Sequence, residues 1–349
     1  MELRNMLRYK MGWADPSGPK NEVVLSSRIR LARNLREFPF PSRGNAKAHA
    51  AVLSAALEAA GKTKALGKAA RIRLDAIEPL DRALLVERHL ASRNLVDEPK
   101  NRAVLVGDRE VASLMVNEED HLRLQVIDSG LCLEELFKTA DALDDELSAS
   151  LDFAFRPDWG YLAACPTNTG TGLRASCLVH LPGLGMLRQM DRVLDGLSRL
   201  GVVARGLYGE GTQVMGDFYQ ISNGTALGAK EKDILATISK VVSSLVQKEL
   251  DARQAMAQGQ GKRRLEDLVW RALGALMNAR VMTFQEAMGH LSAARMALSL
   301  GWDIPADMNA VNELIVQAQP AHVQMLAGKE LAPEDRDYLR AALLRRKFK

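Results

Sequence analysis

Alternating apolar and polar positions predict a β-strand over residues 23–31 (VVLSSRIRL). Successive side chains of a strand point to opposite faces, so the apolar residues, Leu25 among them, share one face. Ser26, Arg28 and Arg30 share the other face. Two arginines stacked on one face repel each other unless an anion lies across them. The pair therefore indicates an anion site or, in the simpler interpretation, a solvated outer face.

A second alternating segment covers residues 117–126 (NEEDHLRLQV) and predicts another strand with a charged face. Alternation puts Glu119, His121 and Arg123 on one side. On a strand that rises ~3.3 Å per residue, Glu119 and Arg123 would be too far apart for an ordinary ion pair. We therefore expect them to address two parts of one ligand, with a charged, solvated sheet face as the alternative.

Residues 165–178 (CPTNTGTGLRASCL) combine a turn rich in glycine and threonine with a third predicted strand. The glycines would let the backbone approach a ligand closely. No Gly-Lys-Ser/Thr follows, so the segment is not a Walker loop. In the strand, Arg174 and Ser176 face away from the apolar residues. Cys165, taken alone, would be an inert small hydrophobic residue.

Residues 205–212 (RGLYGEGT) are typical of a glycine-interrupted loop, and they carry Arg205 and Glu210. Such a loop can act as a flap that closes over a substrate, although a plain surface loop has the same composition. Together, the four segments supply five arginines and two lone carboxylates. Planar guanidinium donors suit a polyphosphate, and paired carboxylates suit a cation. The combination points to phosphoryl transfer to a positively charged acceptor.

Helical patterns lie between these segments. An alanine-rich stretch over residues 46–70 predicts a helix with weak points at Gly61 and Gly67. Residues 141–151 carry apolar residues at helical spacing and predict a surface helix.

The pattern changes at a polar Gln/Gly stretch over residues 254–261 (QAMAQGQG), which we interpret as a boundary. Beyond it the chain is almost wholly helical in pattern. We therefore predict an α+β domain over residues 1–255 and a small all-helical domain over residues 256–349.

The predicted helical domain has marked helix ends. Thr283 and Glu286 have the spacing of a capping box, and the helix they open is expected to run to Gly301. Pro320 interrupts the next helical stretch, and Pro333 suits the first turn of the last helix.

Composition narrows the class of protein. The 349 residues are 47% hydrophobic and 26% charged, which is typical of a globular chain. No apolar run approaches the ~18–20 residues that span a bilayer, and the charged N-terminus lacks the apolar centre of a signal peptide. The net charge of +4 and the 5% aromatic content argue against nucleic acid. Cys132, Cys165 and Cys177 cannot all pair and form no C-x-x-C, so we expect a cytoplasmic protein without disulfides or a structural zinc site.

Four motifs, SSRIRLARN, NEEDHLR, CPTNTGTGLRAS and RGLYGEG, resemble in this order the phosphagen (ATP:guanido) kinase superfamily over about residues 20–250. Within it the chain resembles the bacterial protein-arginine kinases. The SSRIR motif begins at Ser26 and leaves no room for the N-terminal helical domain of small-molecule members, and RDYLRA at 336–341 matches that branch's RDxxRA motif. The resemblance implies an antiparallel sheet flanked by helices, followed by a small all-helical domain. Thr169 and Cys177 replace more usual aliphatic residues without removing a charge, so we expect an active enzyme.

The resemblance also implies which residues hold ATP, with Mg²⁺ arriving on the nucleotide and touching Glu118 at most through water. No dedicated metal site is expected. His89 is implied to lie against the adenine, whereas on sequence alone it would be an ordinary helix-face histidine. The implied ATP-binding residues are Ser26, Ser27, Arg28, Ile29, Arg30, His89, Arg123, Arg174, Ala175, Ser176, Cys177, Leu178, Arg205, Gly206, Leu207, Tyr208, Gly209 and Glu210.

The implied catalytic residues are Glu119, Glu210 and Cys165. The two glutamates match the pair that clamps the acceptor guanidinium, and Cys165 matches the cysteine beside it. A guanidinium is a poor nucleophile because it is protonated and delocalised, so one carboxylate must take a proton as transfer proceeds. We favour Glu119 as that base, since it lies on a predicted strand. Glu210 would orient the substrate on closure, and Cys165 would act as an oxidation-sensitive thiolate.

The RDxxRA segment has a separate interpretation. If Pro333 starts a helix, Arg336 and Arg340 lie one turn apart on the same face, with Asp337 beside them. The resemblance implies that Arg336, Asp337, Arg340 and Ala341 form an allosteric phosphoarginine pocket. The alternative is a solvated basic C-terminal helix.

The leading functional prediction is an ATP-dependent kinase for arginine residues in proteins. The resemblance further implies roles in stress response and protein quality control, with proteins marked for a Clp-type AAA+ protease and a zinc-binding activator protein as partner. A kinase for free arginine or another small guanidine, and a non-catalytic phosphoarginine-binding adaptor, are the alternatives. A homodimer or higher homo-oligomer is expected, because a small helical domain often needs a partner to bury its apolar face.

Overall fold

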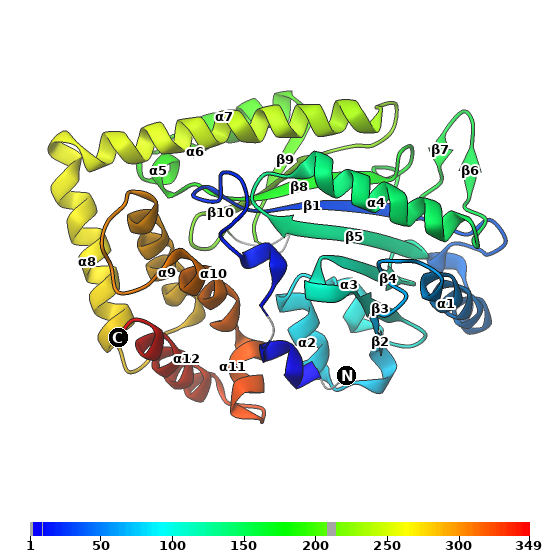
Figure 1. The fold of residues 1–349 in the computed structure, drawn as a ribbon, viewed down its shortest axis with the longest axis horizontal. Helices are drawn as coiled ribbons and strands as arrows, with labels where there is room; N and C mark the ends of the chain where they lie inside the picture. The colour runs from blue at the N-terminus through cyan, green and yellow to red at the C-terminus, as the bar shows by residue number, and fades with distance from the viewer. Residues whose placement is uncertain (1–2, 9, 208–213) are drawn as a thin grey trace.

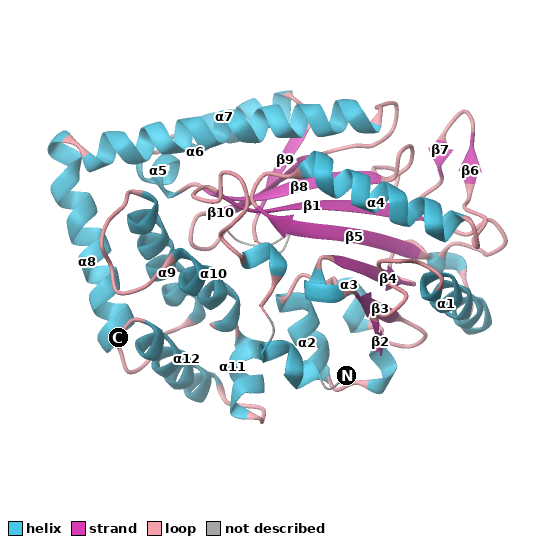
Figure 2. Ribbon diagram, viewed as in Figure 1, coloured by secondary structure: helices cyan, strands magenta, loops and turns pink. Residues whose placement is uncertain are grey.

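The computed structural model describes residues 3–8, 10–207 and 214–349, and its centre is one eight-stranded antiparallel sheet (Figures 1 and 2). The strand order is β2-β3-β4-β5-β1-β8-β10-β9, so β1 lies in the middle between β5 and β8. The strands are β1 (Val24–Arg33), β2 (Ala70–Arg73), β3 (Ala103–Val106), β4 (Ala112–Val116), β5 (Leu122–Ser129), β8 (Leu173–His180), β9 (Val202–Arg205) and β10 (Phe218–Asn223). A separate hairpin pairs β6 (Phe155–Arg156) with β7 (Gly160–Tyr161).

Helices surround the sheet and then continue alone. Those in the sheet region are α1 (Ala46–Gly61), α2 (Pro79–Glu87), α3 (Arg93–Asp97), α4 (Leu133–Ser148), α5 (Pro182–Met186), α6 (Met190–Arg199) and α7 (Glu231–Ala257). The C-terminal ones are α8 (Lys262–Asn278), α9 (Phe284–Ser299), α10 (Met308–Gln317), α11 (Pro320–Ala327) and α12 (Pro333–Lys347). Figure 1 shows this second group gathered beside the sheet, with α11 next to α2. The predicted α+β class, antiparallel sheet and C-terminal helical part are confirmed.

The largest hydrophobic core covers one face of the sheet. Ile29 and Leu31 of β1 pack there with apolar side chains of α1, α4 and α7. The opposite face meets two other cores, one built with α8, α9, α10 and α12 and one built with α2 and α3. The space between these two cores leaves part of this second face open, which is where the cleft described below lies.

A β-bulge overturns one sequence expectation. The register between β1 and β8 shifts between Val24 and Ser26, which turns Leu25 to the face opposite Ile29. Leu25 packs there with Ile127 and Leu178 in the core that also holds α8, α9, α10 and α12. Strict alternation placed it with Ile29, and that prediction was wrong because one extra residue reverses the phase of a strand.

Predicted helices differ mainly in their limits. The helix expected over 46–70 ends at Gly61, and β2 begins at Ala70. At Gly67 a Cβ would lie 2.6 Å from the Thr63 carbonyl oxygen, so the turn between them needs glycine. The helix expected over 141–151 begins earlier, at Leu133, and buries its apolar face in the main core.

The helix ends of the C-terminal region are confirmed. Thr283 and Glu286 form both bonds of a capping box, and Gly301 follows the helix with a φ of +74°. Pro320 and Pro333 each occupy the first turn of a helix. The polar stretch over 254–261 contains the end of α7 and a short 3₁₀ turn before α8. None of the described helices is both long and apolar enough to cross a bilayer.

Candidate active site

Strand register places four arginines on one face of the sheet. Arg30 of β1 lies between Gln125 of β5 and Arg174 of β8, and Arg123 pairs with the next residue on that face, Ala32. Directly paired residues of antiparallel strands project to the same side. Arg28 precedes Arg30 by two positions and so joins them. Arg205, the last residue of β9, extends this face through its pairing with Gln220 of β10.

These arginines line a cleft of about 440 Å³ that the remaining motifs complete. Glu118 and Glu119 contribute from the turn before β5, and Cys165 contributes from the turn before β8. His89 enters just beyond α2. The structure thus brings together residues that are far apart in the chain: Arg28, Arg30, His89, Glu119, Arg123, Cys165, Arg174 and Arg205.

A small recess adjoins the cleft and shares Arg28, His89 and Gln220 with it. The recess is lined by side chains that the nucleotide prediction also contained: Ser26, Ser176, Leu178 and Leu207. Its wall is therefore largely apolar beside the basic cleft.

Several predicted contacts have side chains that face the opposite way. Ile29, Ala175 and Cys177 lie in the main core. Ser27 is fully buried, and its Oγ donates to the Gly130 carbonyl at 2.7 Å and accepts from the Cys132 N–H at 3.1 Å. Alternation along β1 and β8 explains this, because every second side chain points away from the cleft. Only the backbone of these residues is on the side of the cleft.

The predicted flap is described in part. Arg205 belongs to β9 rather than to a loop, because it pairs with Gln220. Gly206 follows the strand, and the buried Leu207 lines the recess. Tyr208, Gly209 and Glu210 lie outside the described residues.

The acidic turn overturns the spacing expected for Glu119 and Arg123. Asn117 has a φ of +59°, and its N–H donates to the His121 carbonyl at 2.8 Å, so the chain reverses before β5 begins at Leu122. Glu119 consequently lies 3.2 Å from Arg123 and forms an ion pair with it. The buried Glu118 pairs with the same guanidinium at 2.7 Å. The prediction that 119 and 123 are too far apart was wrong because it assumed an extended strand.

His121 and Asp120 hold this turn in place. His121 is buried; its Nδ1 accepts from the Leu35 N–H at 3.0 Å, and its Nε2 lies 2.9 Å from the Pro39 carbonyl. Asp120 accepts from the Asn34 amide at 2.6 Å and from the Ala164 N–H at 2.7 Å. Asp120 thereby fixes the acidic turn against the residue that precedes Cys165. Sequence reasoning missed this role, although the residue stands inside the motif.

Two arginines of the basic wall, Arg28 and Arg30, lie half-buried among like charges. Burial and the neighbouring Arg123 and Arg174 lower the pKa of Arg28 to about 10. Burial and neighbouring guanidinium groups lower the pKa of Arg30 well below its usual range. Among the described residues, no partner accepts from the buried Nε of Arg30. Burial, with Arg28 and Arg30 nearby, lowers the pKa of His89 to about 3, so its ring is neutral at pH 7. A polyanion would supply the opposite charge and an acceptor for that Nε.

On the acidic side, the pKa of Glu119 is raised, chiefly because burial disfavours its charge. Cys165 donates a side-chain hydrogen bond to Glu119, and its Sγ lies 3.0 Å from the Thr167 hydroxyl. Two groups that handle protons therefore stand at the mouth of an otherwise basic cleft. Within the part of the chain that is described, no cluster of three His, Cys, Asp or Glu side chains could hold a metal ion.

The C-terminal helices reach the cleft through α2. Glu87, at the end of α2, accepts from the N–H groups of Ala321 and His322 at 2.7 and 2.9 Å and lies 2.7 Å from His322 Nδ1. His89 of the cleft is two residues further on. Glu87 therefore fixes the start of α11 beside the cleft wall.

The RDxxRA residues lie on α12, one step further away. Arg340 is buried and donates to the carbonyls of Ala318 at 2.6 Å and Met282 at 2.9 Å. Asp337 also pairs with Arg340. Arg336 is only half-buried. Arg340 therefore connects α12 to Ala318, which lies two residues before α11 begins.

Comparison with known proteins gives consistent results across the chain. Residues 51–252 match the family described as ATP:guanido phosphotransferase, C-terminal catalytic domain, and residues 262–349 match the protein-arginine kinase McsB C-terminal domain. The chain is 45% identical to a protein-arginine kinase of Moorella thermoacetica over 336 residues, which are 95% of this chain and 96% of that one. It is 41% identical to that of Halothermothrix orenii over 346 residues, 99% of each chain.

Solved structures with a similar fold include a taurocyamine kinase and a lombricine kinase. The duplicated taurocyamine kinase of Schistosoma mansoni, with bound transition-state analogue components, has a TM-score of 0.61 at 26% identity, covering 70% of this chain and 35% of that one. A lombricine kinase has a TM-score of 0.60 at 24% identity, covering 71% of each chain, which shows the fold alone.

Proposed function

The chain belongs to the ATP:guanido phosphotransferase family, in its protein-arginine kinase branch, and we propose that the cleft carries out the transfer from MgATP to arginine side chains of proteins. One observation supports this assignment of the site above all others. A single cleft holds a wall of arginines together with Glu119 and Cys165. Among the described residues, the Nε of Arg30 in that wall has no acceptor.

The basic wall is the proposed nucleotide site. Arg28, Arg30 and Arg174 face one another across β1 and β8, and Arg205 lies at the far side of the same cleft. Their forks suit the oxygens of a triphosphate. The neutral ring of His89, which lines both the cleft and the adjoining recess, suits contact with a purine base. Mg²⁺ would arrive on the phosphates, and Glu118, which lines the same cleft, would contact it at most through water.

The acidic mouth is the proposed acceptor site. A guanidinium nitrogen of the substrate attacks the γ-phosphorus, the N–P bond forms, and the bond from γ-phosphorus to the bridging oxygen breaks. The nitrogen loses a proton, which the Glu119 carboxylate accepts. The raised pKa of Glu119 favours this role, since a stronger base takes the proton more readily. Cys165 holds the carboxylate from the other side.

The resting pairing of Glu119 with Arg123 has a mechanistic meaning under this proposal. A substrate guanidinium offers the carboxylate the same kind of partner that Arg123 provides in this structure. Phosphate oxygens in the cleft would draw Arg123 toward them and release Glu119 for the substrate. The catalytic roles of Glu119, Glu210 and Cys165 are parts of the proposal.

Regulation through the RDxxRA residues is a further part of the proposal. Arg336 would contact the phosphate of a phosphoarginine and Asp337 its guanidinium, while the buried Arg340 would hold Asp337 in place. Support comes from the bonded route Arg340–Ala318 and then Ala321–Glu87, which leads to the helix that precedes His89. Arg336→Ala is the informative variant, because Arg340 also holds two backbone carbonyls and its loss would disturb the fold. We expect Arg336→Ala to keep basal activity and lose the response to added phosphoarginine, with Arg346→Ala as a control that keeps both.

The cellular role is proposed on the resemblance of the chain. It comprises cytoplasmic marking of proteins for a Clp-type protease, a zinc-binding activator as partner, and self-association. The exposed apolar side chains of α8, Leu268 at 40% and Trp270 at 55%, support self-association of the helical region.

Incubation with MgATP and either casein or free arginine tests the proposed function. We expect acid-labile phosphate on arginine side chains of casein, and phosphate on free arginine alone would contradict the proposal. Glu119→Gln should lower kcat by ~10²–10⁴-fold, the range typical of a general base. The matched control is Glu58→Gln, which removes an exposed carboxylate of α1 that pairs only with Lys62.

A further inference from the structure

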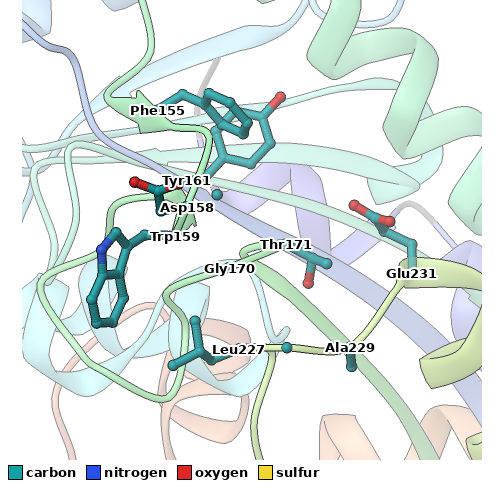
Figure 3. A pocket seen from close by; sticks show the side chains of 11 residues that line it. Phe155, Asp158, Trp159, Tyr161, Gly170, Thr171, Leu227, Ala229 and Glu231 are labelled. Atoms are coloured by element: carbon teal, nitrogen blue, oxygen red, sulfur yellow. The ribbon is translucent and has the colours of Figure 1, made fainter.

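A second pocket, of about 630 Å³, lies between the β6–β7 hairpin and the start of α7 (Figure 3). Phe155, Trp159 and Tyr161 line it from the hairpin, and Leu227 lines it from the opposite loop. Figure 3 shows the rings of Phe155 and Tyr161 side by side, with Glu231 on the far side of the pocket from Trp159. We call this pocket the hairpin groove.

Three large apolar side chains around the hairpin groove are exposed to solvent. Phe155 is 46% exposed, Trp159 50% and Leu227 46%. Contiguous exposed apolar side chains around a pocket mark a binding surface more often than scattered ones do. Large aromatic side chains also supply much of the binding energy where they meet a partner.

Neighbouring side chains fix the position of Tyr161 in the aromatic wall of the groove. Phe155 meets Tyr161 edge to face, with ring centroids 5.3 Å apart. The Arg33 guanidinium lies 3.5 Å from the centre of the Tyr161 ring and pairs with the buried Asp144 at 2.8 Å. A surface that is already ordered loses little conformational entropy when a partner binds.

Charge indicates the chemistry of the occupant. The charged side chains that line the groove are Asp158 and Glu231, and both are acidic. A carboxylate next to the face of an aromatic ring suits a lysine or arginine side chain, by ion pairing and by cation–π contact. The groove therefore fits a basic segment of polypeptide.

The groove is next to the active site along two chain segments. In the first, Cys165 and Asn168 line the catalytic cleft while Gly170 and Thr171 line the groove. The three residue-to-residue steps from Asn168 to Thr171 span at most ~10 Å.

The second segment repeats this arrangement. Gly224 lines the cleft and Leu227 lines the groove. The Ala226 N–H donates to the Thr167 carbonyl at 3.1 Å and joins the two segments. Gly170 and Tyr161 exchange backbone hydrogen bonds, which fix the hairpin to the same unit.

We propose that the hairpin groove binds a basic segment of the protein substrate that flanks the arginine being phosphorylated. The proposal rests on the proposed function, because only a polypeptide acceptor extends beyond the catalytic cleft. A second copy of this chain is the other occupant that an aromatic surface could accept. The acidic residues that line the hairpin groove favour a cationic substrate segment over a second copy.

Two synthetic peptides test the groove. Each has 15 residues and one central arginine; one carries lysines four to seven positions from it on both sides, and the other carries serines there. The variant is the double substitution Asp158→Asn and Trp159→Ala. We expect its KM for the lysine peptide to rise ~5- to 10-fold, while kcat, the KM for ATP and the KM for the serine peptide stay at wild-type values.

The control is the double substitution Asp195→Asn and Leu200→Ala, which removes an exposed acid and an exposed apolar side chain near α6. Equal KM changes for both peptides, or the same change in the control, would overturn the groove proposal. Dissociation of a wild-type oligomer by the groove variant in sedimentation would assign the groove to a second copy and overturn it too. If wild-type protein phosphorylates neither peptide nor casein, the proposed function itself is refuted.

Discussion

Two sets of arginines in this chain show what separates a structural guanidinium from a functional one. One set lies at the junction of the sheet with the C-terminal helices. There, Arg253 donates to Glu249 at 2.6 Å, to the Glu22 carbonyl at 2.9 Å and to the His180 carbonyl at 2.8 Å. Arg295 donates to Asn312 at 3.1 Å and to the same Glu22 carbonyl at 3.0 Å.

The other set forms the wall of the cleft. Arg28 and Arg30 are surrounded by further guanidinium groups, and among the described residues the Nε of Arg30 has no acceptor. Burial lowers the pKa of arginines in both sets, so burial does not distinguish them. Their acceptors distinguish them: the protein supplies acceptors at the junction, whereas among the described residues the Nε of Arg30 has none, and a ligand would supply one.

The largest effect is expected at the junction. Arg253→Met leaves the fully buried Glu249 carboxylate with only the N–H groups of Gly183 and Leu184. Loss of one partner from a buried pair costs ~3–5 kcal/mol. The free energy of unfolding in urea should fall by that amount, whereas Arg192→Met, which removes an exposed arginine of α6, should change it by less than ~0.5 kcal/mol. A fully stable Arg253→Met protein would remove the structural half of the comparison.

The opposite pattern is expected in the cleft. Arg30→Gln removes a donor for the transferring phosphate, and kcat/KM should fall by ~10²–10³-fold. Its unfolding free energy should be unchanged or higher, because the substitution relieves repulsion from Arg28, Arg123 and Arg174. Tripolyphosphate should raise the Tm of wild-type protein more than that of the variant. Activity within tenfold of wild type would show that Arg30 does not belong to the functional set.

The smallest expected effect concerns His89, the histidine beside the arginines of the cleft. His89 has a pKa near 3 when folded against 6.5 as its ordinary value. Between pH 7 and 5 the unfolded ring gains a proton that the folded ring does not, so stability falls on acidification. The contribution of His89 at pH 5 is about 2 kcal/mol. His89→Gln should remove that share of the acid loss in urea unfolding, and an unchanged loss would contradict the assignment.

Anion binding provides a second test, which compares the pKa of His89 with that of His180. Phosphate groups next to Arg28 and Arg30 would offset their charge, so tripolyphosphate should raise the pKa of His89 in a titration followed by NMR. His180, whose pKa is lowered by burial and by Arg295 and Arg253, should not respond. An equal response of both rings would mean that the two sets of arginines do not differ in their access to anions.

Sequence patterns predicted local features well because alternation and capping depend on neighbours in the chain. The arginine face of β1 and the capping box at Thr283 follow from such rules. Two local exceptions escaped them: the bulge at Leu25 and the reversal at Asn117. Each changes the direction of one residue, and hydrophobic periodicity contains no signal for a single left-handed or inserted residue.

Long-range pairing was beyond the patterns alone. The position of β1 between β5 and β8 decides which arginines meet. This position depends on contacts between distant residues, such as Ser27 and Cys177, which are 150 positions apart. The charges of the four motifs suggested one shared site, and the resemblance to guanidino kinases supported it. It did not indicate that Asp120 anchors the acidic turn or that Glu87 fixes α11, because both roles arise from contacts between distant segments.

The bulge that turns Leu25 inward has a consequence for how the protein comes apart. The core of the C-terminal helices is completed by Leu25, Ile127 and Leu178 from the sheet and by Trp13 near the N-terminus. A protease that cut between α7 and α8 would leave each fragment with half of a shared interior exposed to water. We therefore expect the C-terminal helices and the sheet to unfold together, as a single cooperative unit.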